Sequence, residues 1–401
     1  MTKIDDQLTL DAVQAGLTLE PTAAQAEPES EAFGFILNFL APIAHLVRDH
    51  SISEIMINGS AQVFVERAGH LEHQPGITVD QATLDTAVTI IARKLGDDFS
   101  EKKPILDARL PDGSRVAAVR PPCSLGGTTL TIRKFNNRRW TLDELVNTGC
   151  IPPAVLATVQ NAILSHKNIM ISGGTGTGKT TMLNAFASLI PRNERLVVIE
   201  DTAEIHLTAP NLVRFEARRS QTGSTPDDEI PKVDIRDLLR ATLRHRPDRI
   251  ILGEIRGGEA FDLLQALNTG HSGTLSTIHA NSAELSLMRF SSCVLEAGVD
   301  LPFLAICTQI ANSLNYVVHI DRKGGRRQVA QLLEVTGYDL DAHHYNVKPL
   351  YDRDNPVETA PESDGLAALA EAVTPNQIHY HLTELLKLAG LTPAQPGLAN
   401  L

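Results

Sequence analysis

The chain has 401 residues, enough for two domains that each bury a hydrophobic core. Hydrophobic residues make up 42% of the chain and charged residues 21%, a balance that excludes a fibrous or mainly disordered protein. The formal net charge of -12 argues against a protein that coats nucleic acid, because such proteins need a broadly basic surface.

Residues 1–32 are predicted to form a flexible acidic leader, since they are polar and show no hydrophobic period. They lack the basic start and apolar block of a secretory signal. The most apolar early stretch is about 15 residues long, whereas a membrane-spanning helix needs roughly 20. The four cysteines lack metal-binding spacing and are typical of free thiols in a reducing compartment. We therefore expect a cytoplasmic protein that meets a membrane through partners.

Residues 33–135 are predicted to form a small α+β domain, in which helices and antiparallel strands alternate. The turn residues Asp112 and Gly113 favour a chain reversal between two of the strands. An Asp N-cap at Asp80 precedes the clearest helical period. The expected helices cover residues 33–48 and 80–95, and the expected strands cover residues 55–58, 62–66 and 128–133.

Residues 136–150 are predicted to be a linker with a short helix after Thr141, and residues 151–338 an α/β domain. Helices between apolar strands indicate a mainly parallel sheet that is covered on both faces. Residues 339–401 are predicted to be a polar extension with a late helix at 377–388. The expected strands of the α/β domain cover residues 168–172, 195–200, 212–215, 249–253 and 273–278.

A complete phosphate-binding loop follows the first of these strands and opens a helix. In such a loop, glycines let backbone N–H groups curl around phosphates, and the helix N-terminus adds partial positive charge. Lys179 is expected to reach the β- and γ-phosphates, and the Thr180 hydroxyl to bind Mg²⁺. The expected ATP-binding residues are Gly173, Gly174, Thr175, Gly176, Thr177, Gly178, Lys179, Thr180 and Thr181.

Acidic residues follow two further apolar runs, with Asp201 and Glu204 after one and Glu254 after the other. Because the carboxyl ends of parallel strands border the ligand crevice, both clusters are expected to reach the phosphates. His279 follows a third run, and a neutral imidazole there could contact the γ-phosphate or a water molecule. A buried structural histidine is the alternative for that position.

The combination of the phosphate-binding loop with IEDTAEI, RPDRIILGEIR and GHSGTLSTIHAN resembles the type II/IV secretion ATPase superfamily over residues 33–335. Within it, the stretches 235–248 and 257–260 are most similar to the tight-adherence pilus assembly ATPases, with conjugative and type IV secretion ATPases close behind. The resemblance implies a P-loop (RecA-like) α/β ATPase domain with a smaller N-terminal α+β domain.

The resemblance also implies roles for the acidic residues. It makes Glu204 the group that polarises the attacking water, supported by Asp201, and it places Glu254 at the Walker B position. Thr180, Asp201 and Glu254 are the expected Mg²⁺ site. Gly253 stands where many P-loop enzymes have an Asp, so the division of labour between Glu204 and Glu254 stays open.

The resemblance further implies that His279 contacts the γ-phosphate and that Arg115 and Arg133 lie over the nucleotide. Arg246 corresponds to a phosphate-side or interface arginine. Arginines suit this task because negative charge spreads over the transferring phosphoryl group. Separately, Arg236, Arg240 and Arg244 share a helix face, which favours a solvated surface over an interface with a neighbouring subunit.

Together these features predict a hexameric motor that powers pilus assembly or secretion, driven by ATP and Mg²⁺, with a polytopic inner-membrane platform protein as its partner. A conjugative or type IV secretion ATPase is the alternative. A nucleic-acid translocase is a weaker one, because the chain is acidic and has one Trp and five Tyr for base stacking. A non-hydrolysing scaffold is disfavoured by the intact Lys179 and Thr180.

Overall fold

The computed structural model describes residue 38 and residues 40–59, 62–67, 69–110, 112–135, 140–218 and 230–357. The chain divides into two compact units. The first holds the described residues up to 135 with Arg218 and residues 230–233, and the second holds residues 140–217 and 234–357. The acidic leader, residues 136–139 of the linker and the late helix at 377–388 lie outside the described residues.

The first unit is built on a six-stranded antiparallel sheet with the order β3-β2-β1-β6-β5-β4. This agrees with the α+β expectation, including the hairpin between β4 and β5. The elements are η1 (Ala41–Ile43), α3 (Ala44–Arg48), β1 (Ile52–Asn58), β2 (Gln62–Arg67), β3 (His70–His73), α4 (Gln81–Lys94), β4 (Ile105–Arg109), β5 (Arg115–Val119) and β6 (Thr129–Arg133).

Alternation of buried and open positions gives this sheet one core face. Ile55, Val116 and Ile132 are buried with the apolar side of α4, and a hydrophobic residue of this size contributes about 1.5–3 kcal/mol on burial. Helix α4 begins as expected, because the Asp80 carboxylate accepts the Thr83 N–H at 3.0 Å. The opposite face of the sheet carries charged side chains and is considered with the site.

The second unit contains an eight-stranded sheet with the order β14-β13-β12-β7-β11-β10-β8-β9. The strands from β12 through β9 are parallel, and β13 and β14 add antiparallel strands at one edge. Its strands are β7 (Ile169–Gly173), β8 (Leu196–Glu200), β9 (Leu212–Glu216), β10 (Arg249–Ile255), β11 (Leu275–His279), β12 (Tyr316–Lys323), β13 (Arg326–Asp339) and β14 (His344–Asp352).

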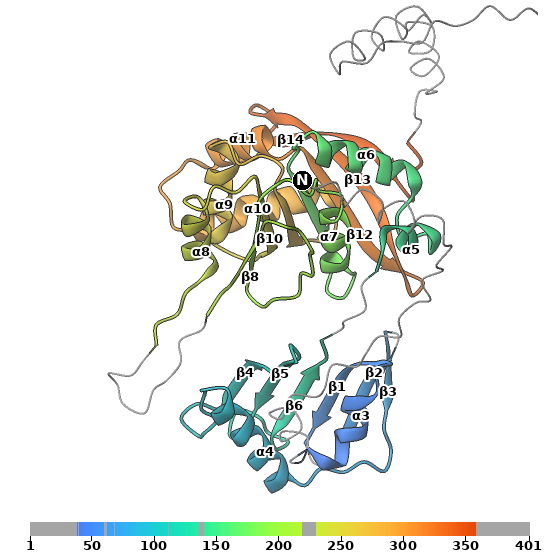
Figure 1. Ribbon diagram of the computed structural model, residues 1–401, viewed down its shortest axis with the longest axis vertical. Helices are drawn as coiled ribbons and strands as arrows, with labels where there is room; N and C mark the ends of the chain where they lie inside the picture. The colour runs from blue at the N-terminus through green and yellow to red at the C-terminus, as the bar shows by residue number, and fades with distance from the viewer. Residues whose placement is uncertain are drawn as a thin grey trace, which may run out of the picture. The chain divides into compact units, whose positions relative to one another are not determined.

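Helices cover both faces of this sheet, as the sequence predicts (Figure 1). Along β10, Ile250 and Leu252 pack under one helical layer, whereas Ile251 between them packs under the other. One layer consists of α8 (Ile235–Thr242), α9 (Glu259–Asn268), α10 (Ala283–Glu296) and α11 (Phe303–Ser313). The other consists of α5 (Leu142–Asn147), α6 (Pro153–Leu164) and α7 (Lys179–Ala187).

Two boundaries differ from the sequence expectation. The sheet continues past residue 338 through β14 to Asp352, so this part of the expected polar extension is an edge strand. Its polar residues fit an edge, because one face of an antiparallel edge strand can meet water. Helix α5 belongs to the second unit, where Leu145 is buried in the same cluster as α6 and α7, rather than to a linker.

Candidate functional site

The phosphate-binding loop lies between the carboxyl end of β7 and the amino end of α7. Gly176 and Gly178 have φ of 71° and 96°, which glycine adopts without a Cβ penalty. At Gly173, a Cβ would overlap the backbone oxygen of Ile320 on β12 and lie 2.7 Å from the Thr177 hydroxyl. Thr175 is exposed at the loop tip, and Thr181 is half-buried on α7. The loop therefore has the backbone that phosphate binding requires.

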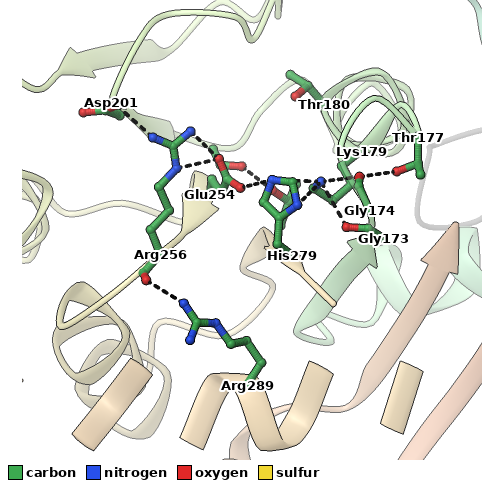
Figure 2. Close-up of polar contacts among 12 residues, drawn as sticks. Gly173, Gly174, Thr177, Lys179, Thr180, Asp201, Glu254, Arg256, His279 and Arg289 are labelled. Carbon is green, nitrogen blue, oxygen red and sulfur yellow. Dashed lines mark hydrogen bonds and ion pairs between the residues drawn. The ribbon is translucent and has the colours of Figure 1, made fainter. Parts of the chain in front are cut away.

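Lys179 lies at the centre of the loop and is 8% exposed. Its ammonium donates to the backbone oxygens of Gly173 at 3.1 Å and Gly174 at 2.9 Å. It also lies 3.2 Å from the His279 Nδ1 (Figure 2). A cation inside a ring of backbone amides and carbonyls is a ready partner for phosphate oxygens.

His279 and Glu254 meet beside this lysine, as expected from the carboxyl ends of β11 and β10. The His279 Nε2 lies 2.7 Å from the Glu254 Oε1. Partial burial and the neighbouring Lys179 ammonium lower the pKa of His279, whereas Glu254 acts in the opposite direction. Burial and Lys179 therefore favour the neutral imidazole. The alternative of a buried structural histidine does not hold, because its side chain is 45% exposed.

The acidic loop after β8 is fixed by side chains that accept its backbone N–H groups. The Glu200 carboxylate accepts from Glu204 at 2.7 Å and Ile205 at 2.8 Å, and Asn184 on α7 accepts from His206 at 2.7 Å. Burial raises the pKa of the Glu200 carboxyl to about 7, although these N–H groups oppose the shift. Glu200 is a positioning residue that the sequence analysis did not single out.

This anchoring brings Glu204 to the phosphate-binding loop. The Thr180 hydroxyl donates to the Glu204 Oε2 at 3.3 Å, although the two residues come from different strand ends. Hydroxyl and carboxylate oxygens are the ligands that Mg²⁺ prefers, and such sites are completed by phosphates and water. Thr180, Asp201 and Glu254 supply oxygen donors of this kind, and their binding of a magnesium ion stays a prediction.

Gly253 has a packing reason at the position where other P-loop enzymes carry an Asp. A Cβ there would lie 3.1 Å from the Glu200 Cγ, which is tighter than ordinary contact. The Thr277 hydroxyl also donates to the Gly253 oxygen at 2.6 Å. The glycine leaves room for the Glu200 side chain, which holds the acidic loop in place. The carboxylates near the phosphate-binding loop are therefore those of Glu204 and Glu254.

Arg256, which the sequence analysis passed over, joins two of the expected acids. Its guanidinium lies 2.6 Å from the Glu254 Oε2 and 3.2 Å from the Asp201 Oδ2 (Figure 2). A second arginine, Arg327 on β13, donates to the Gly176 oxygen of the phosphate-binding loop at 3.0 Å. Arg256 ends the quoted stretch RPDRIILGEIR without having been given a role there, whereas Arg327 lies outside the family motifs. Each reaches its partners in the site only through the fold.

The expected arginines of the first unit lie side by side on its open sheet face. Arg115 pairs with Arg133 across β5 and β6, and Arg109 pairs with Arg115 across β4 and β5. Glu54 and Glu66 continue the same row on β1 and β2. Three adjacent guanidinium groups repel one another and form a surface suited to a polyanion. The register therefore adds Arg109 to the two expected arginines.

Arg246 does not join the phosphate site within the chain. It is exposed and precedes the amino end of β10, whereas the phosphate-binding loop follows the carboxyl end of the parallel strand β7.

On helix α8, Arg236 and Arg240 both pair with Asp262 of α9, at 2.6 and 2.9 Å. The Arg240 side chain is 55% exposed, as a solvated face requires, whereas that of Arg236 is 29% exposed, and a largely buried carboxylate lies between them.

Comparison with known proteins decides the family. The family model of type II/IV secretion system proteins matches residues 38–346. The chain belongs to this family. Its relatives include the conjugal transfer protein TrbB of Rhizobium radiobacter, 36% identical over 294 residues that cover 72% of this chain and 85% of TrbB. The type IV secretion system protein PtlH of Bordetella pertussis is 36% identical over 310 residues, covering 70% of this chain and 89% of PtlH.

Among solved structures, the ATPase DotB of Legionella pneumophila superposes with a TM-score of 0.52 at 17% identity, covering 79% of this chain and 84% of DotB, and shows the shared fold. Membership of the type II/IV secretion family confirms the predicted superfamily, its fold class and its nucleotide-binding ATPase activity. The chain is therefore an ATPase of the type II/IV secretion family, and its role as a pilus motor stays a prediction. The tight-adherence branch stays a prediction.

No helix in the described part of this secretion ATPase is long and apolar enough to cross a membrane.

Proposed function

We propose that the chain is a hexameric motor that hydrolyses ATP with Mg²⁺ at the cytoplasmic face of the inner membrane and works on a polytopic platform protein of a pilus or secretion system. One observation supports this most directly. Groups from four strand ends converge on the phosphate-binding loop of one unit: Lys179, Thr180, Glu204, Glu254 and His279.

In this proposal Lys179 exchanges its contacts with loop carbonyls for oxygens of the β- and γ-phosphates. Glu204 orients the attacking water and takes up its proton, since it lies next to Thr180 on an anchored loop. The neutral His279 has a single N–H, which would turn from the Glu254 carboxylate to a γ-phosphate oxygen when ATP binds.

Thr180, Asp201 and Glu254 would hold the magnesium ion, whose contribution is to neutralise negative charge on the phosphates. In the described residues, no group of three or more His, Cys, Asp or Glu side chains is close enough to bind a metal without other ligands. This matches the usual behaviour of Mg²⁺, which takes one or two protein carboxylates and completes its shell with phosphate and water.

Arg115 and Arg133, together with Arg109, would neutralise charge that develops on the γ-phosphoryl group. Their support is the side-by-side placement on one sheet face, which concentrates three positive charges within neighbouring strands. Arg246 would act at an interface between subunits, because it is exposed and distant from the phosphate-binding loop of its own chain.

A phosphate-release assay tests the proposal. The purified chain with ATP and Mg²⁺ should release phosphate, Lys179→Ala should abolish the release, and chelation of Mg²⁺ should do the same. Lys348→Ala is the matched control, since Lys348 is an exposed lysine on the edge strand β14. Lack of hydrolysis under every assembly condition, or an active Lys179→Ala variant, would contradict the proposal.

The choice of machine is a further proposal. Similarity to proteins named for conjugal transfer and type IV secretion favours such a system, whereas the sequence stretches around Arg236 and Glu259 favour a tight-adherence pilus. Neighbouring genes for prepilins would support the pilus, and genes for conjugation components would support transfer. Stimulation of hydrolysis by single-stranded DNA would instead favour a nucleic-acid translocase.

A further inference from the structure

Arg256 contacts two acids of the site from one guanidinium group. Its Nε and Nη2 lie 2.7 and 2.6 Å from the Glu254 Oε2, and its Nη1 donates to the Asp201 Oδ2 at 3.2 Å. Asp201 follows β8, whereas Glu254 lies within β10. Arg256 is therefore a bridge between the acidic loop and the Walker B strand.

The backbone of Arg256 is held from two helices. Its N–H donates to the Glu259 carboxylate of α9 at 2.5 Å, and the following N–H of Gly257 donates to the same oxygen at 2.8 Å. On the other side, Arg289 of α10 donates to the Arg256 carbonyl at 3.2 Å (Figure 2). A Cβ at Gly258 would lie 3.0 Å from the Ala297 Cα, so this turn packs tightly on the end of α10.

A fixed backbone and a half-exposed head distinguish this arginine. The Arg256 side chain is 51% exposed, whereas that of Glu254 is 17% exposed. Surface ion pairs of this exposure contribute little to stability, about 0–1 kcal/mol. The bridge therefore contributes little to stability. Its position between Asp201 and Glu254 indicates another role.

We propose that Arg256 is a positioning residue for hydrolysis, which holds the Glu254 and Asp201 carboxylates in a fixed arrangement relative to each other. The two oxygens of Glu254 are divided between partners, since Oε1 meets His279 and Oε2 meets Arg256. Loss of the guanidinium frees one oxygen and leaves two nearby carboxylates to repel each other. The proposal rests on the proposed function, because it deepens the same site.

Steady-state kinetics give the first test. Arg256→Gln should lower kcat by about ten- to a hundredfold, since a misplaced catalytic group costs that much, and leave ADP affinity within about twofold. Arg256→Lys keeps the charge without the planar fork and should recover part of kcat. Arg192→Gln is the matched control and should behave as wild type, because Arg192 is an exposed arginine that precedes the amino end of β8.

A double variant shows whether Arg256 acts through Asp201. If Arg256 acts through Asp201, the losses of kcat caused by Arg256→Gln and Asp201→Asn should not multiply. The double variant should then have the kcat of the slower single variant. Independent, multiplying effects would overturn the proposal. A kcat for Arg256→Gln within twofold of wild type would overturn it as well. So would a fall in ADP affinity and in Tm that accompanies the fall in kcat, since it would indicate a general structural defect.

Hydrogen exchange without turnover separates this proposal from the function itself. Arg256→Gln should speed amide exchange in residues 201–205 and leave residues 173–179 unchanged, because the bridge ends on the acidic loop. Unchanged exchange in residues 201–205 would overturn the proposal even if ATP is hydrolysed. A wild-type chain that hydrolyses nothing would contradict the proposed function, while this exchange result would still decide the bridge.

Discussion

The two ends of strand β10 each carry an arginine paired with a glutamate, and the two pairs differ in almost every other respect. At the amino end, the Arg249 side chain is 0% exposed and lies 2.5 Å from the Glu194 Oε2. It also donates to the Ile163 oxygen at 2.8 Å. At the carboxyl end, the Arg256 head is half-exposed beside the phosphate-binding loop.

This difference shows how one strand can serve stability at one edge and chemistry at the other. A buried pair is held in one arrangement, because either partner alone would be an uncompensated charge in a medium of low polarity. A half-exposed pair loses little when it opens, because water can solvate both groups. Only the second kind can exchange partners with a metal ion, a phosphate or water during a reaction cycle.

The largest effect is expected at the buried end. Arg249→Met leaves Glu194 buried without its partner and should lower the free energy of unfolding by about 3–5 kcal/mol. Arg256→Met should lower it by less than about 1 kcal/mol. Urea unfolding of both variants measures the contrast, and equal losses would show that exposure does not separate the two pairs.

At the reactive end, the expected change is in rate rather than in stability. Glu204→Gln keeps the size of the side chain but removes the base, so kcat should fall about 10²–10³-fold with unchanged Tm. Its backbone N–H still donates to Glu200, which keeps the loop in place. Glu284→Gln, an exposed acid on α10, is the control for loss of one negative charge. A Glu204→Gln variant with normal kcat would transfer the base role to Glu254.

Two glycines of one motif sharpen the picture of the buried end. Gly273 has φ of 82°, and a Cβ there would lie 2.5 Å from the Arg249 Nη1. Gly270 has φ of 97° with open space around it. Gly270→Ala should therefore cost about 1–2 kcal/mol for backbone strain alone, and Gly273→Ala about 2–4 kcal/mol because crowding is added. Equal losses of unfolding free energy would contradict the packing argument.

Sequence patterns predicted the central sheet because a parallel strand covered on both faces is a continuous apolar run. Strand β8, with Leu196 through Ile199 all buried, is such a case. Strand β14 was missed because its alternation of polar and apolar residues is short and is interrupted at Pro349. Its pairing with β13 is a tertiary event that no local period announces.

The site shows the same division. Lys179 and Thr180 were predictable, since a contiguous motif carries its own local geometry. The roles of Glu200 and Arg256 were not predictable, because each depends on how the chain folds around the site. Glu200 accepts the backbone N–H groups of the loop that follows it, and Arg256 reaches an acid 55 positions away. Arg109 was not predictable for a similar reason, since only strand register places it beside Arg115.

The smallest expected effect concerns Glu200. Its side chain is buried like the Arg249 pair, but it holds the acidic loop of the reactive end. Burial raises its pKa to about 7, from about 4.5 in the unfolded chain. Between these values the folded chain holds a proton that the unfolded chain releases, so this contribution to the free energy of unfolding is complete below pH 4.5 and is lost as pH rises through 7.

Glu200→Gln does not titrate, and its amide oxygen can still accept the Glu204 N–H. From pH 5 to pH 8 the unfolding free energy of the wild type should fall by about 2 kcal/mol more than that of the variant, as urea unfolding at both pH values would measure. A parallel pH dependence in the two proteins would mean that Glu200 is charged in the folded chain throughout, and that the acidic loop is held by an ionised carboxylate.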